Sequence, residues 1–413
     1  MPANDHPAAE RPPVDPAPFQ YPSFDAPAPR RNLVICFDGT NNRFGPENTN
    51  VVRLVQVLDR DPARQRLYYD PGVGTLPRPD LNVVDELLSR VPGLAFGIGL
   101  EENVEEAYGY LMDIWEPGDH VHIFGFSRGA YTARVLAGLL HLLGLLPRGN
   151  QNMITYAMEL FRAVRGKKGK KYEKYRELCD QFRWTFGRPL FEGDDKRHFR
   201  VHFLGVWDTV SSVGWARNPK SYQFTHRNPS ISVVRHAVSV DERRAFFRQN
   251  QMEQTGSEQD LQELWFPGVH SDVGGGYPNV QGKQLWRVCF EWMLEEARRA
   301  GLRVDEERLA MVRGAPIPAE PWNEAMGNSL TPVWRLAEYV PKWRYSFKTG
   351  EHHWRMNLGR PRTIKKGSRI HRSTLLRIRT GRYDPPNLTP AFIQKVKALP
   401  DVPEWLETDD ELD

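Results

Sequence analysis

The sequence has few cysteines, no long apolar run and little net charge, and each of these absences removes a class of protein. Cys36, Cys179 and Cys289 are the only cysteines among 413 residues, and no two of them form a C-x-x-C pair. This spacing supports neither a disulfide framework nor a cysteine zinc site, and it is typical of a chain that folds in a reducing compartment.

Membrane-spanning and secretory signals are also missing from the sequence. No stretch approaches the roughly 20 consecutive apolar residues of a spanning helix, and residues 1–30 lack the apolar core of a Sec signal. We therefore expect a protein that is cytoplasmic as synthesised, for which any export would use a signal-free route. The formal net charge of +4 is small beside 56 basic and 52 acidic residues, and nucleic acid is not an expected partner.

The composition changes along the chain and suggests three regions. Residues 1–30 are dense in Pro, Ala and Asp without periodicity, which predicts a disordered tail. Residues 31–300 carry the alternating strand and helix pattern of an α/β domain, interrupted at 148–199 by a helical, basic insertion. Residues 301–413 form a C-terminal extension that we expect to pack on or beside the core of that domain.

Short β-branched or aromatic runs alternate with helical patterns in the second region. The runs predict strands within 33–42, 66–75, 120–129, 200–210, 233–242 and 261–276, and the helical patterns cover 100–115, 130–146 and 285–301. Such alternation favours an α/β fold with a doubly wound, mostly parallel sheet.

The stretch VHIFGFSRGAYTAR, residues 121–134, carries the clearest chemical motif. A G-x-S-x-G pentapeptide alone is a weak signal, but here an apolar strand precedes it and an apolar helix follows it, which is the context of a nucleophile elbow. Ser127 is therefore the candidate nucleophile.

A serine nucleophile needs a base and an acid that orients the base. His270 is the candidate base because it follows the last predicted strand in the glycine-rich loop GVHSDVGGGY. The acid is Asp208, after the first strand beyond the nucleophile, or Asp241, after the second. Asp208 is favoured because its neighbours are small and apolar, whereas charged residues crowd Asp241.

An oxyanion hole is expected from backbone N–H groups near the elbow. Arg128 would supply one donor, and Gly39 or Thr40 in CFDGTNN would supply the other. Asp38 and Asn41 would line the same site. A carboxylate opposes developing negative charge, so Asp38 should be neutralised, for which Arg128, His270 and a metal ion are the candidates.

Six motifs occur together and in order: FDGTNN, YYDPGVGT, GFSRGAYTAR, FLGVWDTV, HAVSVDERR and WFPGVHSDVGGGY. This set, over residues 32–290, resembles the α/β-hydrolase domain family that includes the family-one lipase effectors of bacterial type VI secretion. The resemblance implies a phospholipase or lipase without a cofactor, with Ser127, Asp208 and His270 as the triad. It also implies phospholipid as substrate and secretion or immunity proteins as partners.

The leading hypothesis also includes peripheral contact with an anionic membrane. The basic run from Arg162 to Arg176 in the insertion is one candidate surface for this contact. The aromatics Trp334, Trp343, Tyr345 and Trp354 are another, with core packing as the alternative interpretation.

Three other functions compete with the lipase hypothesis. The chain could act as a soluble carboxylesterase on smaller acyl esters. Asp38, His270 and Asp272 could hold a divalent metal for phosphoester cleavage, in which case Asp272 lines the site as a ligand. The scaffold could also be a non-catalytic binding module, although every triad residue is present.

Overall fold

The computed structural model describes residues 31–39, 45, 47–72, 96–190, 198–210, 222–314, 318–339, 342–346 and 351–409. The tail predicted over 1–30 lies outside these residues. In the described part, eight strands form one sheet in the order β10-β9-β6-β5-β4-β3-β1-β2. The strands are β1 (Asn32–Phe37), β2 (Gln65–Asp70), β3 (His120–Phe126), β4 (Val201–Trp207), β5 (Ile231–Ser239), β6 (Asp260–Phe266), β9 (Arg369–His371) and β10 (Trp405–Glu407).

Neighbouring strands run parallel throughout this sheet, except that β9 and β10 are antiparallel. The predicted α/β class with a mostly parallel sheet is therefore confirmed. Each of the six strand segments expected from the sequence overlaps one of the strands β1 to β6, and the expected and observed starts differ by at most two residues. The predicted runs extend beyond the strands because each one includes the loop that follows.

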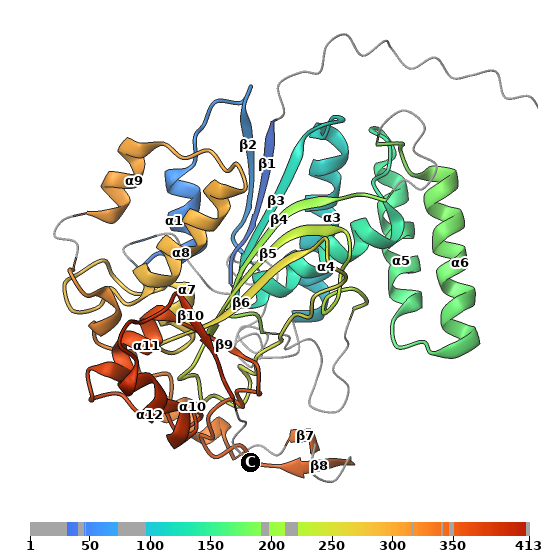
Figure 1. Cartoon of the computed structure of the whole chain (residues 1–413). Helices are drawn as coiled ribbons and strands as arrows, with labels where there is room; N and C mark the ends of the chain where they lie inside the picture. The colour runs from blue at the N-terminus through green and yellow to red at the C-terminus, as the bar shows by residue number, and fades with distance from the viewer. Residues whose placement is uncertain are drawn as a thin grey trace, which may run out of the picture.

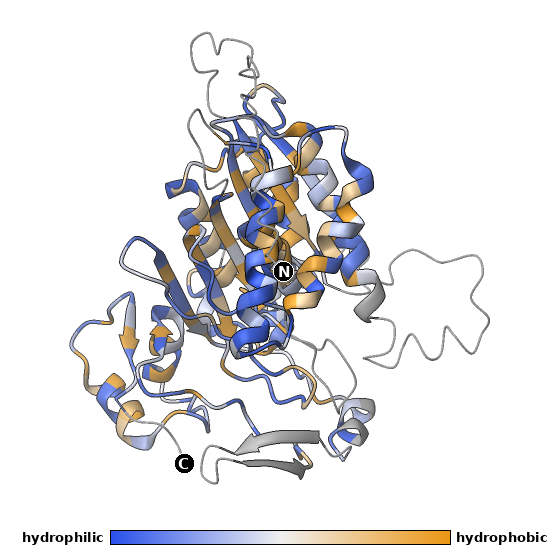
Figure 2. Cartoon of the chain, turned by 90° about the vertical axis from the view of Figure 1, so that its right-hand side faces the viewer, coloured by the Kyte–Doolittle hydropathy of each residue, from blue (hydrophilic) through white to orange (hydrophobic). Residues whose placement is uncertain are grey.

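Helices cover both faces of the sheet (Figure 1). One face carries α3 (Phe96–Ile114) and α4 (Arg128–Leu143), and the other carries α1 (Asn50–Val57) and α8 (Trp286–Arg299). In β1, Leu33, Ile35 and Phe37 join the core on the α3–α4 side, whereas Val34 and Cys36 join the core on the α1–α8 side. Burial on both faces explains why the central strands are apolar throughout. Figure 2 shows the same pattern, with hydrophobic residues concentrated in the strands at the centre.

The expected helical insertion contains α5 (Ile154–Val164) and α6 (Gly169–Phe186), preceded by the 3-10 turn η1 (Gln151–Met153). These helices pack against α3 and α4 at one side of the molecule (Figure 1). Exposed lysines occupy the turn between them and the start of α6: Lys167, Lys168, Lys170, Lys171 and Lys174.

The C-terminal region adds strands to the central sheet itself. β9 pairs with β6, β10 pairs with β9, and Ile370 of β9 packs in a core cluster with Trp265 of β6. The remaining elements are α7 (His270–Gly274), α9 (Glu306–Arg313), η2 (Pro321–Asn323), α10 (Pro332–Ala337), a two-stranded ribbon of β7 (Lys342–Ser346) and β8 (Glu351–Arg355), α11 (Arg372–Arg379) and α12 (Pro390–Ala398).

The strand order reverses direction between β1 and β3. From β1 the chain continues to β2 on one side, and all later strands lie on the other side, beginning with β3. In open α/β sheets, ligands bind at the carboxyl ends of the strands beside such a switch point. Asp38 follows β1 and Ser127 follows β3, so both residues lie at this place.

Candidate active site

Ser127 occupies a tight turn between β3 and α4. Its backbone has a φ angle of 59°, which residues other than glycine rarely adopt. The turn is held to β4 on both sides, because Ser127 N donates to Trp207 O at 3.0 Å and Val210 N donates to Ser127 O at 3.2 Å. This strained and anchored backbone is the geometry of a nucleophile elbow.

The two glycines of GFSRG are required by close backbone contacts. A Cβ on Gly129 would lie 2.3 Å from the carbonyl oxygen of Phe37, and a Cβ on Gly125 would lie 2.5 Å from the carbonyl oxygen of Gly129. Any larger residue would push the first turn of α4 away from the end of β1. The glycines therefore bring the elbow directly against the loop that follows β1.

Ser127, His270 and Asp208 are brought together by the ends of three segments that are far apart in the sequence. His270 Nε2 lies 2.8 Å from Ser127 Oγ, and His270 Nδ1 lies 2.5 Å from Asp208 Oδ2. The three residues are buried, with exposures of 7%, 4% and 1% for Ser127, His270 and Asp208. With the proton on Nδ1 donated to Asp208, Nε2 is free to accept the serine proton.

Burial sets the protonation state of His270. Desolvation lowers the pKa of the imidazole below its ordinary value, and this effect outweighs the hydrogen bond and charge of Asp208, which act in the opposite direction.

The His270 ring is also fixed by packing, since the Phe126 and Phe247 rings lie 4.6 and 4.8 Å from it, centroid to centroid. His270 N donates to Glu242 Oε2 at 3.2 Å, which anchors the start of α7.

Asp208 is held by more partners than the sequence suggested. Ser239 N donates to Oδ1 at 2.8 Å, and Arg362 makes contacts of 2.5 Å to Oδ1 and 2.9 Å to Oδ2. Burial would raise the pKa of Asp208, but the charge of Arg362 and the hydrogen bond from His270 hold it well below its usual range. Arg362 and His270 therefore favour the charged form of Asp208.

The alternative acid, Asp241, has a different environment. Its Oδ2 accepts hydrogen bonds from Gly268 N and from the Tyr383 hydroxyl, each at 2.7 Å. Burial raises the pKa of Asp241 to about 6. These contacts tie Asp241 to the loop before His270, whereas Asp208 meets the imidazole itself.

The residues expected at the oxyanion hole come from the start of α4 and from the loop after β1. Arg128 is the first residue of α4, as the elbow requires. Gly39 N donates to Asp38 Oδ1 at 2.6 Å in this structure, so this N–H is engaged by the neighbouring carboxylate. Thr40 and Asn41 lie outside the described residues.

Asp38 is almost fully buried and receives two hydroxyl hydrogen bonds that sequence reasoning missed. Thr49 Oγ1 donates to Oδ2 at 2.7 Å, and the Tyr69 hydroxyl donates to the same oxygen at 3.1 Å. Thr49 is also the N-cap of α1, where its Oγ1 accepts from Val52 N at 3.2 Å. The carboxylate is thus stabilised by neutral donors in addition to any cation.

Asp272 is the third candidate ligand of the hypothetical metal site, and its side chain instead holds the backbone around α7. Its Oδ2 accepts from Val269 N at 2.9 Å and from Gly327 N at 3.0 Å, and burial raises its pKa to about 6. Within the described ranges, no three His, Cys, Asp or Glu residues are grouped so that they could hold a metal ion. Asp38, His270 and Asp272 are accordingly not gathered as a ligand set.

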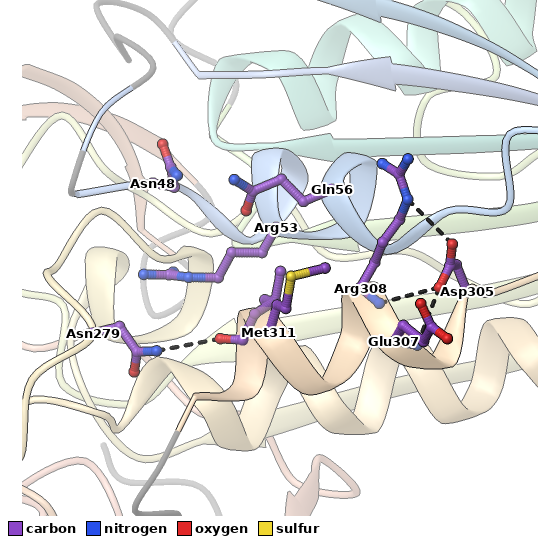
Figure 3. A pocket seen from close by; sticks show the side chains of 9 residues that line it. Asn48, Arg53, Gln56, Asn279, Asp305, Glu307, Arg308 and Met311 are labelled. Carbon is purple, nitrogen blue, oxygen red and sulfur yellow. Dashed lines mark hydrogen bonds and ion pairs between the residues drawn. The ribbon is translucent and has the colours of Figure 1, made fainter.

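A pocket of about 740 Å³ lies away from the triad, between α1 and α9 (Figure 3). Its lining includes Arg53, Gln56, Asn279 and Met311, and none of the triad residues. The guanidinium of Arg53 is stacked 3.4 Å from the centroid of the Trp286 ring, and it donates to Tyr277 O at 2.8 Å. The pocket is therefore separate from Ser127, His270 and Asp208.

Of the four aromatic residues considered for membrane contact, the structure describes the side chain of Trp334 alone. Trp334 packs edge-on against Phe247, with ring centroids 5.4 Å apart, and so stands one ring away from His270. The side chains of Trp343, Tyr345 and Trp354 lie outside the part that the structure describes. No helix among the described residues is long and apolar enough to cross a membrane.

Comparison with known proteins identifies a family that matches most of the chain. The model of the Tle1-like phospholipase effector catalytic domain of the type VI secretion system matches residues 31–296. An uncharacterized protein of Saccharomyces cerevisiae, YEL023C, is 35% identical over 231 residues, which are 53% of this chain and 32% of the yeast protein.

Two solved structures are similar over part of the chain. An uncharacterized protein from Pseudomonas aeruginosa has a TM-score of 0.36 and 20% identity, covering 67% of this chain and 47% of that one. The Tle1 effector bound to the VgrG spike of the type 6 secretion system has a TM-score of 0.34 and 22% identity, covering 61% and 52%. The chain thus spans between about a third and a half of the length of these relatives.

Proposed function

Because the chain belongs to the family of Tle1-like phospholipase effector catalytic domains of type VI secretion, we propose that it is an ester hydrolase that cleaves acyl esters of phospholipids through Ser127. The observation that carries the proposal is the hydrogen-bonded series from Ser127 Oγ through His270 to Asp208, at 2.8 and 2.5 Å. This arrangement suits acyl transfer when the Nδ1 proton of His270 is donated to Asp208 and Nε2 faces the serine hydroxyl.

The first half of the reaction forms an acyl-enzyme. Ser127 Oγ attacks the ester carbonyl carbon while His270 Nε2 takes the hydroxyl proton. Asp208 stabilises the imidazolium that results. The tetrahedral intermediate then expels the lysophospholipid alkoxide, which receives the proton from His270 Nε2 as it leaves.

The second half releases the fatty acid. A water molecule gives its proton to His270 Nε2 as its oxygen attacks the acyl carbon, and the ester bond to Ser127 Oγ breaks. Oγ recovers its proton from His270, so the enzyme returns to its starting state. The net reaction consumes one water and yields one lysophospholipid and one fatty acid.

The negative charge of both tetrahedral intermediates needs backbone donors. Arg128 N, at the start of α4, is the first, since it follows the nucleophile and the helix N-terminus favours negative charge. The second comes from the loop after β1, which Gly129 allows to lie against the elbow. The Gly39 N–H would join the hole by turning from Asp38 Oδ1 to the substrate oxygen.

We also propose that the α5–α6 turn contacts an anionic membrane. Lys167, Lys168, Lys170 and Lys171 are exposed, and none has a carboxylate partner in the described part of the chain. Each such lysine contributes about 1 kcal/mol near an anionic surface. Delivery to that membrane by secretion partners is an expectation from the family, to be tested by co-purification with a type VI spike protein.

Product analysis on phospholipid vesicles tests the proposed reaction. Wild type should release lysophospholipid and free fatty acid in equal amounts, and Ser127→Ala should release neither. Turnover of short-chain nitrophenyl esters without any vesicle hydrolysis would instead identify a soluble carboxylesterase. Vesicle hydrolysis that Ser127→Ala retains in full would contradict the proposed nucleophile.

A further inference from the structure

The site contains a residue from outside the region that the family model matches. The match ends at residue 296, whereas Arg362 lies in the C-terminal region and contacts Asp208 from 154 positions away. Its side chain is fully buried, with 1% exposure, in direct contact with the equally buried carboxylate. A buried cation at this depth requires an anionic partner, and Asp208 is that partner.

Every side-chain nitrogen of Arg362 is committed to the surroundings of the triad. Nη1 contacts Asp208 Oδ1 at 2.5 Å and Ser239 Oγ at 2.7 Å, and Nη2 contacts Asp208 Oδ2 at 2.9 Å. Nε donates to the carbonyl oxygen of Phe247 at 3.0 Å. The guanidinium thus connects the acid with the backbone of the residue whose ring packs on His270.

The main chain around Arg362 is fastened to the hydrolase sheet. Asn387 Nδ2 donates to Arg362 O at 3.1 Å and to Val240 O at 2.8 Å, which joins the C-terminal region to the end of β5. Ile364, two residues on, packs in the same core cluster as Val238 and Trp265. The guanidinium is therefore presented from a rigid support.

We propose that Arg362 is a positioning residue of the hydrolase site and that the C-terminal region thereby supplies part of the active centre. The two parallel contacts fix the plane of the Asp208 carboxylate, so that Oδ2 faces His270 Nδ1 and cannot rotate away. This inference rests on the proposed function, because it assigns Arg362 a task only if the triad works as a triad.

The charge of Arg362 has a second consequence for the base. The charged groups that face His270 are Asp208 at the end of β4, Glu242 and Arg244 after β5, and Arg362 behind Asp208. A cation behind Asp208 reduces the ability of the carboxylate to stabilise the imidazolium. Removing the cation should therefore shift the protonation of His270 to higher pH.

The test compares Arg362→Lys, Arg362→Gln and a matched control, Arg369→Gln, seven residues along on β9. Arg369 is partly exposed, with its partner Glu407 on the neighbouring strand. Active sites are counted by fluorophosphonate labelling, so that activity is expressed per competent Ser127. Vesicle hydrolysis is then measured across pH, giving kcat per labelled site and the acidic limb of kcat/KM.

We expect kcat per labelled site to fall on the order of 10- to 100-fold in both Arg362 variants, as for a misplaced catalytic group. In Arg362→Gln the acidic limb of kcat/KM should also move to higher pH by about one unit. In Arg362→Lys this limb should stay at the wild-type pH, because the positive charge is kept. Arg369→Gln should match wild type. Ser239→Ala is a milder variant for the case in which both Arg362 variants fail to fold. It removes only Ser239 Oγ, which accepts a hydrogen bond from Arg362 Nη1 at 2.7 Å. Its kcat per labelled site should fall severalfold.

Two results would overturn the positioning role. In the first, the variants that fold have the same kcat per labelled site as wild type, and the acidic limb of their kcat/KM profile does not move. The other is a loss of activity that only follows the loss of labelled protein, which is the behaviour of a structural ion pair. Failure of wild type to label at Ser127, or labelling unaffected by Ser127→Ala, would refute the proposed triad itself and is thereby distinguishable.

Discussion

At the scale of single residues, the backbone of Ser127 bears the strain of the site. A non-glycine residue at φ 59° costs of the order of 1–3 kcal/mol, and the contacts of the elbow to β4 hold it there. Ser127→Ala keeps the Cβ and the strain, while Ser127→Gly removes both. We expect Ser127→Gly to have a free energy of unfolding about 1 kcal/mol higher than that of Ser127→Ala.

Chemical denaturation of the two inactive variants measures this difference. Both lack Oγ, so substrate chemistry does not enter the comparison. Equal midpoints and slopes, or a less stable glycine variant, would show that the elbow backbone is not strained.

In the proposed mechanism, His270 sets the pH dependence of the reaction. The base must be neutral, and burial lowers the pKa of His270 below the ordinary value of about 6.5. Activity should therefore persist below pH 6.5 and fall only at more acidic pH. Since Asp208 raises the pKa of His270, Asp208→Asn should move the acidic limb further down while lowering kcat.

The pH profile of kcat/KM on a soluble ester checks this expectation without a change in vesicle structure. An acidic limb above pH 6.5 in wild type, or an upward shift in Asp208→Asn, would contradict the described electrostatics of the site.

The sequence predicts some of these residues and gives no sign of others. Ser127 and His270 were predicted because each lies in a local motif beside a recognisable strand. The sequence favours Asp208 over Asp241 only through the character of their neighbours, because both residues follow strands and only three-dimensional contacts separate them. Arg362 could not be predicted, since no local pattern links a basic stretch to an acid 154 positions away.

At the scale of elements, the elbow depends on how closely α4 approaches β1. Gly129→Ala would place a Cβ 2.3 Å from Phe37 O and 2.4 Å from Asp38 O, and neither backbone atom can move independently of the sheet. We expect a loss of about 1–3 kcal/mol in the free energy of unfolding and a large loss of activity, because the oxyanion loop is displaced.

Gly109→Ala is the matched control. Gly109 lies within α3, where a Cβ would meet only the Ile154 Cδ1 at 3.4 Å. This variant should keep or raise stability, since alanine favours the helix. Similar thermal midpoints for the two alanine variants would mean that the close approach at Gly129 is not needed.

The elements themselves were predicted to different degrees. β1 to β6 follow from short β-branched or aromatic runs, and α4 and α8 follow from longer helical patterns, which tertiary contacts only reinforce. β9 and β10 were missed because each has three residues and lies in a stretch rich in charge. Their pairing is decided by β6 and by the core cluster around Trp265, which the local sequence does not display.

At the scale of the whole molecule, the location of charge matters more than its total. Replacing Lys167, Lys168, Lys170 and Lys171 with Gln brings the formal net charge from +4 to zero. If the α5–α6 turn meets the membrane, binding to anionic vesicles should weaken by about tenfold or more, with a smaller dependence on salt.

The control variant neutralises exposed or partly exposed lysines elsewhere, namely Lys283, Lys365, Lys366 and Lys397, and has the same net charge. It should bind nearly as well as wild type in a vesicle sedimentation assay. Equal weakening in the two variants would indicate a general charge effect, and no weakening in the first would remove the α5–α6 turn from the membrane contact.

The most direct measurement of the central claim is the site and rate of fluorophosphonate modification, mapped by peptide mass spectrometry. In wild type the adduct should lie on Ser127 alone, and its formation should slow by several orders of magnitude in His270→Ala, because the serine then lacks its base. An adduct on another residue, or labelling of Ser127 at an equal rate in His270→Ala, would contradict the account.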